Sequence, residues 1–507
     1  MSNVTDSPVG PTPGRTPESE LGKTIKTGAG WTIAARFAGR IVRFLTFFFV
    51  AKLLGPNLVG VIGVIYMIDP IGMIVTRLGL SAAIVQKTDA TADHFDAAMI
   101  INVAAGLAFA GVVVVLAPVL GWWLEDELLK QILPWYSLVF AVRAFSYVPS
   151  AVMRRKMEFR KFATMGECAN VCGCFVMLAF AFAGQGVWCV FWAELMRAVL
   201  LSVFSIALSG HRFRPRFRIK AAREMAGFSG WVTMTSIFYY GLCNIDKLVV
   251  RVVFGSTAMG LYVFAFRLIS QPLEQIAMRL YEVMFPAFSR FRDQPEEVLR
   301  VYRKLVCTIA MFALPFLGIA LVLADEFFRV FMNPKWLDAI LPFRILCFAG
   351  MARAFVGSSS ALLKSRGYVK FEGLALAALA ASMAICANVG SLFGHLAGVA
   401  VGVDIVIAAY LISYLVYQAR KGIAGVGVFV DAVMPVVQCT LIAVTACVGV
   451  VWLLTAVIDL GDVARLFISG AVATIVFVLA VMRHPNSTVR SVVWELKRVV
   501  RRTKDDE

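Results

Sequence analysis

The sequence is poor in charge, and it lacks the motifs by which soluble enzymes are usually recognised. Only 16% of its residues are Asp, Glu, Lys or Arg, whereas 60% are hydrophobic. Such a composition leaves too little polar surface to cover a soluble globule. The sequence also has no glycine-rich phosphate loop, no nucleophile elbow and no metal-ligand spacing among its four histidines. We therefore expect a membrane protein that is not an enzyme, with no catalytic residue, no cofactor and no metal.

The ten cysteines form no redox or zinc motif. Cys172 and Cys174 are separated by a single residue, and no second pair supports a metal site. Nearly all the cysteines fall within apolar segments, where cysteine acts as a small packing residue. The connections between those segments are short, none longer than about twenty residues. The chain therefore has no sizeable soluble domain.

Long apolar segments recur along the whole chain. About 20 mostly apolar helical residues cross the ~30 Å hydrocarbon core of a membrane. The sequence supplies this length fourteen times, so we predict an all-α, polytopic membrane protein with about fourteen transmembrane helices. The predicted spans are Trp31–Leu54, Leu58–Ile84, Phe95–Leu120, Leu128–Met153, Thr164–Ala183, Val187–Leu208, Ala226–Phe254, Met259–Phe285, Tyr302–Ala324, Ala339–Leu363, Gly373–Phe393, Leu396–Tyr417, Ala432–Val457 and Val463–Met482.

The connections between the spans carry unequal positive charge. Alternate connections and the two chain ends hold 32 of the 49 Lys and Arg residues, whereas the connections on the other side hold six. Connections rich in Lys and Arg stay cytoplasmic. We therefore predict a protein of the cell (inner) membrane with both termini in the cytoplasm. Contact with anionic membrane lipids then accounts for the net charge of +17, and no nucleic acid is expected as a partner.

The segments outside the spans differ from the spans in composition. Residues 1–20 are rich in Ser, Pro, Thr and Gly, which predicts disorder. Residues 489–500 could form a short basic amphipathic helix on the inner leaflet. The predicted organisation is a disordered cytoplasmic tail (1–24), an N-terminal six-helix bundle (25–210), a basic cytoplasmic loop (211–225), a C-terminal six-helix bundle (226–420), two further transmembrane helices (421–482) and a basic cytoplasmic tail (483–507).

The chain contains a weak internal repeat. The segment Leu53–Gly60 (LLGPNLVG) resembles Val253–Gly260 (VFGSTAMG), with the glycines offset by 200 residues. A second match relates Arg143-Ala-Phe145 to Arg353-Ala-Phe355, and both matches join spans that are six apart. An even number of spans gives both halves the same orientation. We therefore predict two parallel repeats related by an axis along the membrane normal, with the substrate path between them.

Several longer segments carry a resemblance to a known family. They are LLGPNLVG, GLSAAIVQKTDAT after the second span, MRRKMEFRKF, the run NIDKLVVRVVFGSTAMGLYVFAFRLISQPLEQI, and MFPAFSRF. Together they resemble the oligosaccharide flippases of the Wzx type, a family of the multidrug/oligosaccharidyl-lipid/polysaccharide exporter superfamily. The resemblance runs from about residue 25 to about residue 400. It implies a fourteen-helix fold that flips a polyprenyl-diphosphate-linked oligosaccharide, and it makes polysaccharide polymerase or assembly proteins candidate partners.

Eleven Lys or Arg residues lie more than three residues inside the predicted spans, and each costs about 2.5–3.5 kcal/mol at a span centre. Arg36, Arg40 and Arg43 share one helical face because four and three residues separate them. This stripe is expected either to line a cationic cavity or to pair with a carboxylate on a neighbouring helix, such as Asp69 or Asp246. The candidate substrate-binding residues are Arg36, Arg40, Arg43, Arg77, Lys247, Arg267 and Arg353.

Three carboxylates within the spans are candidates for ion or proton binding. Asp69 and Asp404 are each alone in their spans, and each could bind a proton or cation or pair with an arginine. Asp246 lies beside Lys247 and could form a salt bridge to another span or contact the substrate. Glu194 and Arg197 are expected to neutralise each other, because residues three apart are neighbours on a helix.

These charges discriminate among three functions. Arginine binds phosphate bidentately and keeps its proton, which favours a flippase for a diphosphate-linked glycolipid. A cation- or proton-coupled multidrug antiporter of the same superfamily would call for a carboxylate-rich cavity, and the sequence supplies few intramembrane carboxylates. A membrane-embedded ligase or glycosyltransferase would need a large exposed loop with acid and base groups. Because the chain has no nucleotide motif, we expect the membrane potential to drive export.

Overall fold

The computed structural model describes residues 17–87, 90–211, 213–214, 217–242, 244–290, 294–456 and 460–495, and within them the side chain of Arg36 is among those left undescribed. No strand occurs in these residues, as the sequence predicts. The helices are α1 (Pro17–Arg77), α2 (Leu80–Gln86), α3 (Ala92–Trp123), α4 (Glu127–Arg155), α5 (Phe159–Phe182), α6 (Trp188–Leu208), α7 (Ile219–Leu242), α8 (Ile245–Arg290), α9 (Pro295–Val322), α10 (Ala324–Phe331), the 3-10 helix η1 (Pro334–Ala339), α11 (Ile340–Ser365), α12 (Val369–Arg420), α13 (Val426–Ala456) and α14 (Asp462–Arg483).

The helices have the length and composition of membrane spans. Within the described residues, twelve stretches are long and apolar enough to cross a membrane. One of them, Ala38–Arg77, is 40 residues long and bends at Gly55, so it holds parts of two predicted spans. The polytopic, all-α architecture predicted from the apolar segments is thus confirmed.

The α12 segment contains two spans that lie against each other. A Cβ added at Gly390 would lie 2.4 Å from the carbonyl oxygen of Gly398, and one added at Gly402 would lie 2.6 Å from that of Cys386. In a straight helix, eight residues would separate Gly390 from Gly398 by about 12 Å. The chain therefore reverses between them, which confirms the split predicted at Gly394-His395. The glycines allow the two backbones to touch.

Two predicted boundaries differ from the structure. The predicted span Ala226–Phe254 is divided, because α7 ends at Leu242 and α8 begins at Ile245. Asn244 stabilises this break, since its side-chain amide donates to the carbonyl of Tyr240 and its side-chain oxygen accepts a hydrogen bond from Lys247. At the other boundary, α1 begins at Pro17, inside the segment 1–24 that was predicted to be disordered. Proline is well tolerated in the first turn of a helix, where its missing N–H has no partner to lose.

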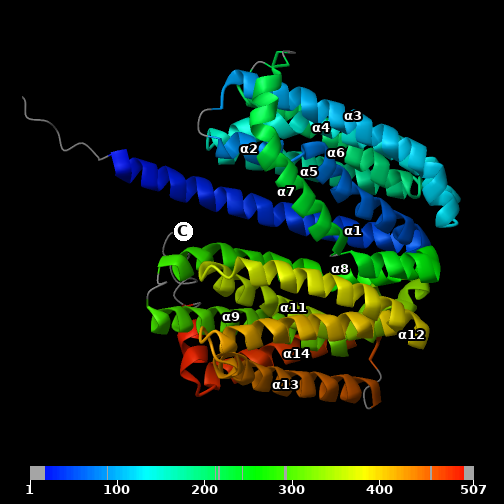
Figure 1. Ribbon diagram of the computed structural model, residues 1–507. Coiled ribbons are helices and arrows are strands. Elements are labelled where there is room, and N and C mark those ends of the chain that lie inside the picture. The colour runs from blue at the N-terminus through cyan, green and yellow to red at the C-terminus, as the bar shows by residue number, and fades with distance from the viewer. Residues whose placement is uncertain are drawn as a thin grey trace, which may run out of the picture.

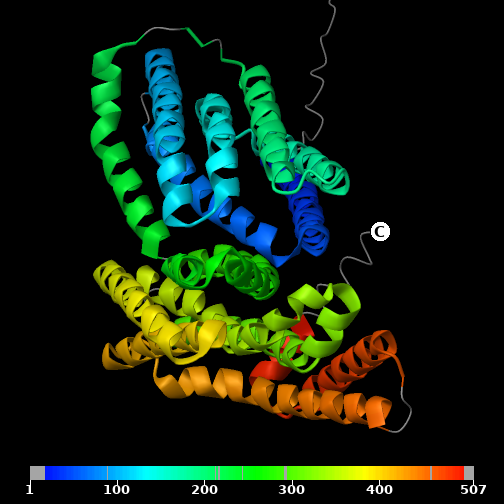
Figure 2. The ribbon, with the colours of Figure 1, turned by 90° about the vertical axis from the view of Figure 1, so that its right-hand side faces the viewer.

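The helices form two lobes that meet along α1 and α8 (Figure 1). The N-terminal lobe contains α1 to α6, and the C-terminal lobe contains α8 to α14. Figure 2 shows the N-terminal lobe above α8 and the C-terminal lobe below it, with α7 running down one side to reach the start of α8. Helices α13 and α14 pack on α9, on the side of the C-terminal lobe that lies away from α1.

The repeat seen in the sequence is present in the backbone. Gly55 in α1 has a φ of 79° and Gly255 in α8 has a φ of 80°, values that favour glycine. The two bends also touch reciprocally. A Cβ at Gly60 would lie 1.8 Å from the carbonyl oxygen of Ser256, and a Cβ at Gly260 would lie 1.8 Å from that of Pro56. This reciprocity confirms the parallel repeat and explains why both positions are glycine.

Polar and aromatic contacts join the lobes at the same end of the helices. Arg251 in α8 donates to Asp126, the residue that caps α4, and Ser256 donates to the same carboxylate oxygen at 2.9 Å. Phe48 of α1 packs edge-on against Phe327 and Phe331 of α10, with ring centroids 5.9 and 6.0 Å apart. The lobes are therefore closed together at this end.

The opposite end carries the connection between α6 and α7, which two histidine–carboxylate pairs attach to α3. His211 lies 3.2 Å from Asp96, and His94 lies 3.1 Å from Glu224 at the start of α7. Lys87 also contacts Glu224, at 2.9 Å. Hydrogen bonds from Lys87 and His94 lower the pKa of Glu224 to about 2. The segments that enter and leave this connection are thereby fixed to the N-terminal lobe.

Candidate functional site

Three of the predicted cationic residues lie together where the lobes meet. Arg267 on α8 lies over the ring of Phe47 at 4.4 Å and over that of Tyr66 at 4.6 Å, and both rings belong to α1. Lys247 on α8 and Arg353 on α11 lie over the ring of Phe266, at 4.6 and 5.3 Å. We call Lys247, Arg267 and Arg353, with the rings that hold them, the interlobe cation cluster.

An aromatic ring can position a cation without neutralising it. The face of a ring attracts a cation through its quadrupole, but it carries no net charge. Arg267 forms no ion pair with any carboxylate of the described residues, whereas Lys247 lies 3.9 Å from Asp246. Asp246 is buried and accepts a hydrogen bond from Tyr262, whose ring stacks on Phe266. Arg267 thus retains positive charge that can attract an anion.

A second group of charges is buried inside the N-terminal lobe. Arg143 on α4 donates to Asp69 at 2.9 Å and to Glu194 on α6 at 2.8 Å. Arg197 pairs with the other oxygen of Glu194 at 2.6 Å, which confirms the neutralisation predicted for these two residues. Tyr136 completes the group by donating to Asp69. We call Asp69, Arg143, Glu194 and Arg197 the N-lobe ion network; its two positive and two negative charges cancel.

Tyr66 connects the two groups. Its ring faces Arg267, and it interacts electrostatically with Glu194 and Arg197 as well. Its backbone carbonyl accepts a hydrogen bond from Tyr240 near the end of α7. The interlobe cation cluster and the N-lobe ion network are therefore neighbours, although one is charged and the other is balanced.

The arginine stripe on α1 has a different partner from those predicted. Arg43 pairs with Glu167 on α5 at 3.0 Å, so of the two alternatives the carboxylate partner on a neighbouring helix holds for Arg43, with Glu167 in place of Asp69 or Asp246. The reason is geometric, since α5 packs directly along α1 while Asp69 is already held by Arg143. Arg40 is half-buried one turn earlier, and the side chain of Arg36 lies outside the described residues.

Of the remaining predicted residues, Arg77 lies outside the cluster, whereas Asp404 binds α11 one turn before Arg353. Arg77, at the end of α1, is exposed and lies over the ring of Tyr147 at 4.7 Å. Asp404 on α12 accepts a hydrogen bond from the backbone N–H of Ala349 at 3.0 Å. Within the described residues, no group of three or more His, Cys, Asp or Glu side chains could hold a metal ion.

Sequence reasoning missed the residues that orient the cations. Phe47, Tyr66 and Phe266 are aromatic residues in apolar helices, and nothing in the sequence distinguishes them from lipid-facing aromatics. Glu167 is similarly one of many charges near a span end. Only the packing of α1 against α5 and α8 shows what these side chains contact.

Comparison with known proteins agrees with this architecture. A family model described as polysaccharide biosynthesis protein matches residues 49–341. The chain is 23% identical over 353 residues to an uncharacterized membrane protein in the cps region of Klebsiella pneumoniae, covering 69% of this chain and 73% of that protein. It is also 23% identical over 359 residues to the lipopolysaccharide biosynthesis protein WzxC of Escherichia coli, covering 68% and 71%.

The fold is also found among solved structures. The lipid II flippase MurJ, in an inward closed conformation, superposes with a TM-score of 0.74 at 16% identity, covering 89% of this chain and 98% of MurJ. At that identity the likeness concerns the fold alone. The family model, by contrast, spans more than half of the sequence, including the bends at Gly55 and Gly255 that form the repeat. The chain therefore belongs to the polysaccharide biosynthesis protein family.

Proposed function

We propose that this protein flips a polyprenyl-diphosphate-linked oligosaccharide from the inner to the outer leaflet of the cell membrane. The observation that carries the proposal is the interlobe cation cluster, which presents positive charge between two lobes related by a parallel repeat. The names of relatives that act in polysaccharide and lipopolysaccharide biosynthesis support a glycan-linked substrate. The MurJ-like fold supports movement of a lipid-linked molecule.

The chemistry of the cluster suits a diphosphate. A guanidinium offers a fork of N–H donors that can bind phosphate oxygens bidentately, and it stays charged at any physiological pH. In the proposal, the rings of Phe47 and Tyr66 hold the plane of Arg267 in place while its edge binds the diphosphate. Lys247 and Arg353, over the ring of Phe266, supply further charge. Arg77, which is exposed at the end of α1, then attracts the anion along the path.

The geometry also suggests how binding is coupled to movement. Arg267 belongs to the C-terminal lobe, while the rings that hold it belong to the N-terminal lobe. A substrate that binds this guanidinium would therefore alter the contact between the lobes. In alternating access, such a contact must change when one side closes and the other opens. The proposed site thus lies where substrate binding and lobe movement meet.

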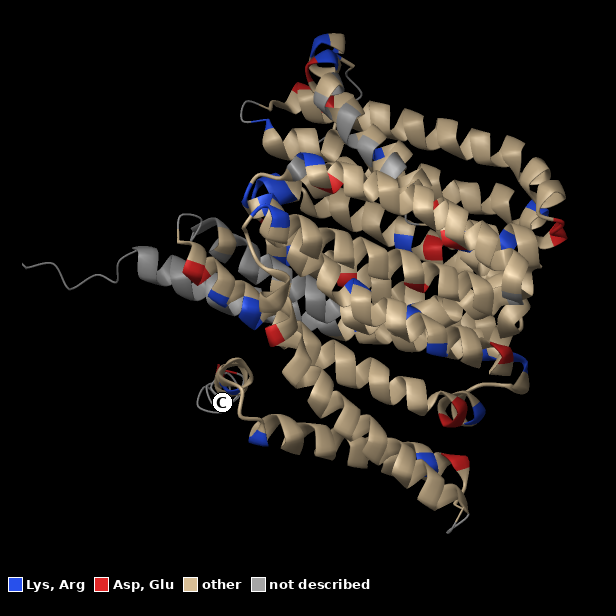
Figure 3. Cartoon of the chain, turned by 60° about the horizontal axis from the view of Figure 1, so that its bottom comes forward, with Lys and Arg blue, Asp and Glu red and all other residues tan. Residues whose placement is uncertain are grey.

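The proposed orientation places both termini in the cytoplasm, with bundles at 25–210 and 226–420 and two added helices at 421–482. Acidic side chains lie at both ends of the helices, and basic side chains gather most densely at one of them (Figure 3). The positive-inside rule then assigns the basic end to the cytoplasm. The closed end at Gly60 and Gly260 would face outward, and a polysaccharide polymerase or assembly protein would take up the product there.

The alternative of a cation- or proton-coupled multidrug antiporter is less well supported. Asp69, the carboxylate best placed for such coupling, is held by Arg143 and Tyr136. Asp246 accepts a hydrogen bond from Tyr262, and Asp404 accepts one from a backbone N–H. No described carboxylate is left to dominate the interlobe surface, so an anionic substrate fits the charges better. A membrane-embedded ligase or glycosyltransferase is likewise not supported by any acid–base pair on an exposed loop.

The proposal is tested by flipping of a lipid-linked oligosaccharide in proteoliposomes. Arg267→Ala should lower the rate at least about tenfold, because hydrogen bonds to charged groups contribute about 1.5–3 kcal/mol. Arg267→Lys should recover only part of this loss, since a point charge lacks the fork. Arg420→Gln, which removes one exposed charge from the end of α12, is the matched control and should flip normally. Equal rates for Arg267→Ala and the control would refute the proposed site.

A further inference from the structure

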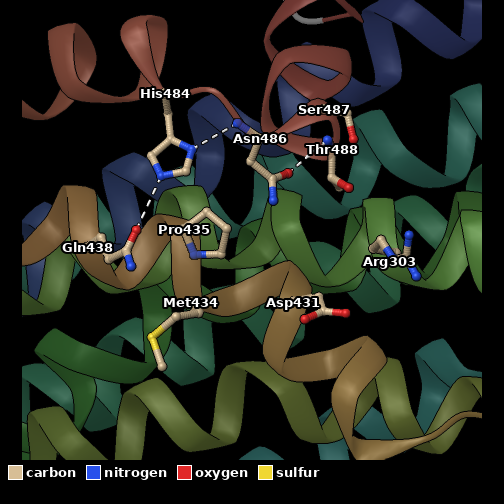
Figure 4. A pocket seen from close by; sticks show the side chains of 9 residues that line it. All are labelled: Arg303, Asp431, Met434, Pro435, Gln438, His484, Asn486, Ser487 and Thr488. Carbon is tan, nitrogen blue, oxygen red and sulfur yellow. Dashed lines mark hydrogen bonds between the residues drawn. The ribbon is translucent and has the colours of Figure 1, made fainter.

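A cavity of about 400 Å³ lies at the ends of α9, α13 and α14, and it shares no lining residue with the interlobe cation cluster (Figure 4). Arg303 of α9, Asp431 and Gln438 of α13, and Asn486 and Thr488 of the chain after α14 line it. A second cavity of about 590 Å³ adjoins it and shares Arg303 and Thr488. The transport proposal uses none of these residues.

One side of the cavity suits an anion. Arg303 pairs with no carboxylate of the described residues, and its Nε is buried without a hydrogen-bond partner. A buried donor on a charged group without a protein partner is free to bind a ligand or solvent group. The hydroxyls of Ser487 and Thr488 lie on the same cavity wall, at the start of the helical segment 487–495. Arg300 and Lys304 add positive charge from the adjoining cavity.

The other side suits a cation. Asp431 is the one acidic residue lining this cavity, and among the described residues it pairs with neither Arg303 nor any other cation. The nearby polar groups already satisfy one another. The Nδ1 of His484 accepts a hydrogen bond from the N–H of Asn486, which leaves its Nε2–H to donate to Gln438. The cavity therefore presents a guanidinium and a carboxylate, on neighbouring helices, that do not neutralise each other (Figure 4).

A ligand that satisfies both groups carries a negative and a positive charge on the same headgroup. A phosphate diester would bind Arg303 through a charge-assisted hydrogen bond, and a primary ammonium on the same ligand would donate to Asp431. This is the chemistry of a phosphoethanolamine headgroup. A headgroup without the ammonium would leave Asp431 beside its own negative charge, and a trimethylated ammonium could not donate a hydrogen bond.

The surroundings of the cavity point to the bilayer as the source of this headgroup. Met434, which lines the cavity, is 49% exposed, and Met482 at the end of α14 is 50% exposed. Trp494, on the segment 487–495, is 60% exposed. Tryptophan is enriched where hydrocarbon meets headgroups, so these residues place the cavity at headgroup depth. The acyl chains of the lipid would then lie along the apolar surface of α13, to which Met434 belongs.

We propose that this cavity binds the headgroup of an aminophospholipid, with the lipid phosphate on Arg303 and the ammonium on Asp431. The bound lipid bridges α9 and α13 to the segment 487–495, whose Val489 and Val492 are buried against the C-terminal lobe. It thereby attaches the last two membrane helices to the rest of that lobe. The proposal does not depend on the transported substrate.

The test is native mass spectrometry of the full, delipidated chain titrated with three phospholipids of identical acyl chains. Phosphatidylethanolamine should bind about tenfold more tightly than phosphatidylglycerol or phosphatidylcholine, because only its ammonium donates a charged hydrogen bond to Asp431. Arg303→Gln should weaken phosphatidylethanolamine binding about tenfold. Asp431→Asn should remove the preference for phosphatidylethanolamine over phosphatidylglycerol. Arg420→Gln, on the same end of the molecule but away from the cavity, should leave binding unchanged.

Melting temperatures of the delipidated variants show whether each variant is folded. Arg303 is only partly buried and Asp431 is exposed, so both variants should melt like the parent chain. Equal binding of the three lipids by the parent chain would overturn the proposal, as would an unchanged lipid preference in folded Asp431→Asn. A last experiment measures the binding of soluble glycerophosphoethanolamine, which has the headgroup without acyl chains. If it binds as tightly as the phospholipid, the cavity recognises a soluble ligand and the lipid assignment is wrong.

Discussion

The N-lobe ion network offers the sharpest test of the buried charges. Arg143 is 6% exposed and contacts Asp69 and Glu194 within 3 Å, while Arg197 pairs with the second oxygen of Glu194. Replacing Asp69 by Asn leaves one surplus positive charge in this group. Replacing Arg143 by Met leaves one surplus negative charge. Removing one partner of a buried ion pair typically destabilises a protein by about 3–5 kcal/mol, so each single variant should lose about that much stability.

The double variant separates charge balance from simple loss of contacts. With Asp69→Asn and Arg143→Met together, the remaining Glu194–Arg197 pair is neutral, and methionine fills part of the space of the arginine stem. Two independent losses would sum to about 6–10 kcal/mol, whereas charge balance predicts a loss no greater than that of either single variant.

Denaturant-induced unfolding in detergent, followed by tryptophan fluorescence, measures these differences. Glu127→Gln is the control, because it breaks the exposed Glu127–Lys130 pair and should cost no more than about 1 kcal/mol. A double variant whose loss equals the sum of the two single losses would refute the reasoning that neutrality holds this group together.

Three further predictions concern packing, orientation and energy. Gly60→Ala should destabilise the closed end or prevent its closure, because its Cβ would meet the Ser256 carbonyl at 1.8 Å. The control Gly449→Ala lies in open space on α13 and should be neutral or slightly stabilising. Thermal unfolding of both variants measures the difference in stability. A cysteine replacing the exposed Phe217 in a cysteine-free chain should resist an impermeant thiol reagent added from outside, and rapid labelling would reverse the proposed orientation. An inside-negative potential of 100 mV should favour export of a diphosphate by about 4.6 kcal/mol. Proteoliposomes clamped with potassium and valinomycin test this, and equal rates and final distributions with and without the potential would exclude such coupling.

The sequence by itself determined the architecture. Apolar segments long enough to span a bilayer predict the helices, because water offers no favourable surroundings for so much hydrocarbon. The repeat was readable from the offset between Gly60 and Gly260, since a backbone–backbone contact admits no side chain. The pairing of Glu194 with Arg197 was also local, because residues three apart on a helix are always neighbours.

Only the tertiary structure decided what the intramembrane charges contact. Arg43 binds Glu167, 124 residues further along the chain, because α5 rather than another helix packs beside it. Arg143 and Arg353 occupy matching places in the repeat, yet one is enclosed by two carboxylates and the other lies over an aromatic ring. A helical pattern fixes the face on which a side chain lies, but the opposing residue comes from a distant segment. Which group an intramembrane arginine contacts therefore depends on helix packing, which no local pattern encodes.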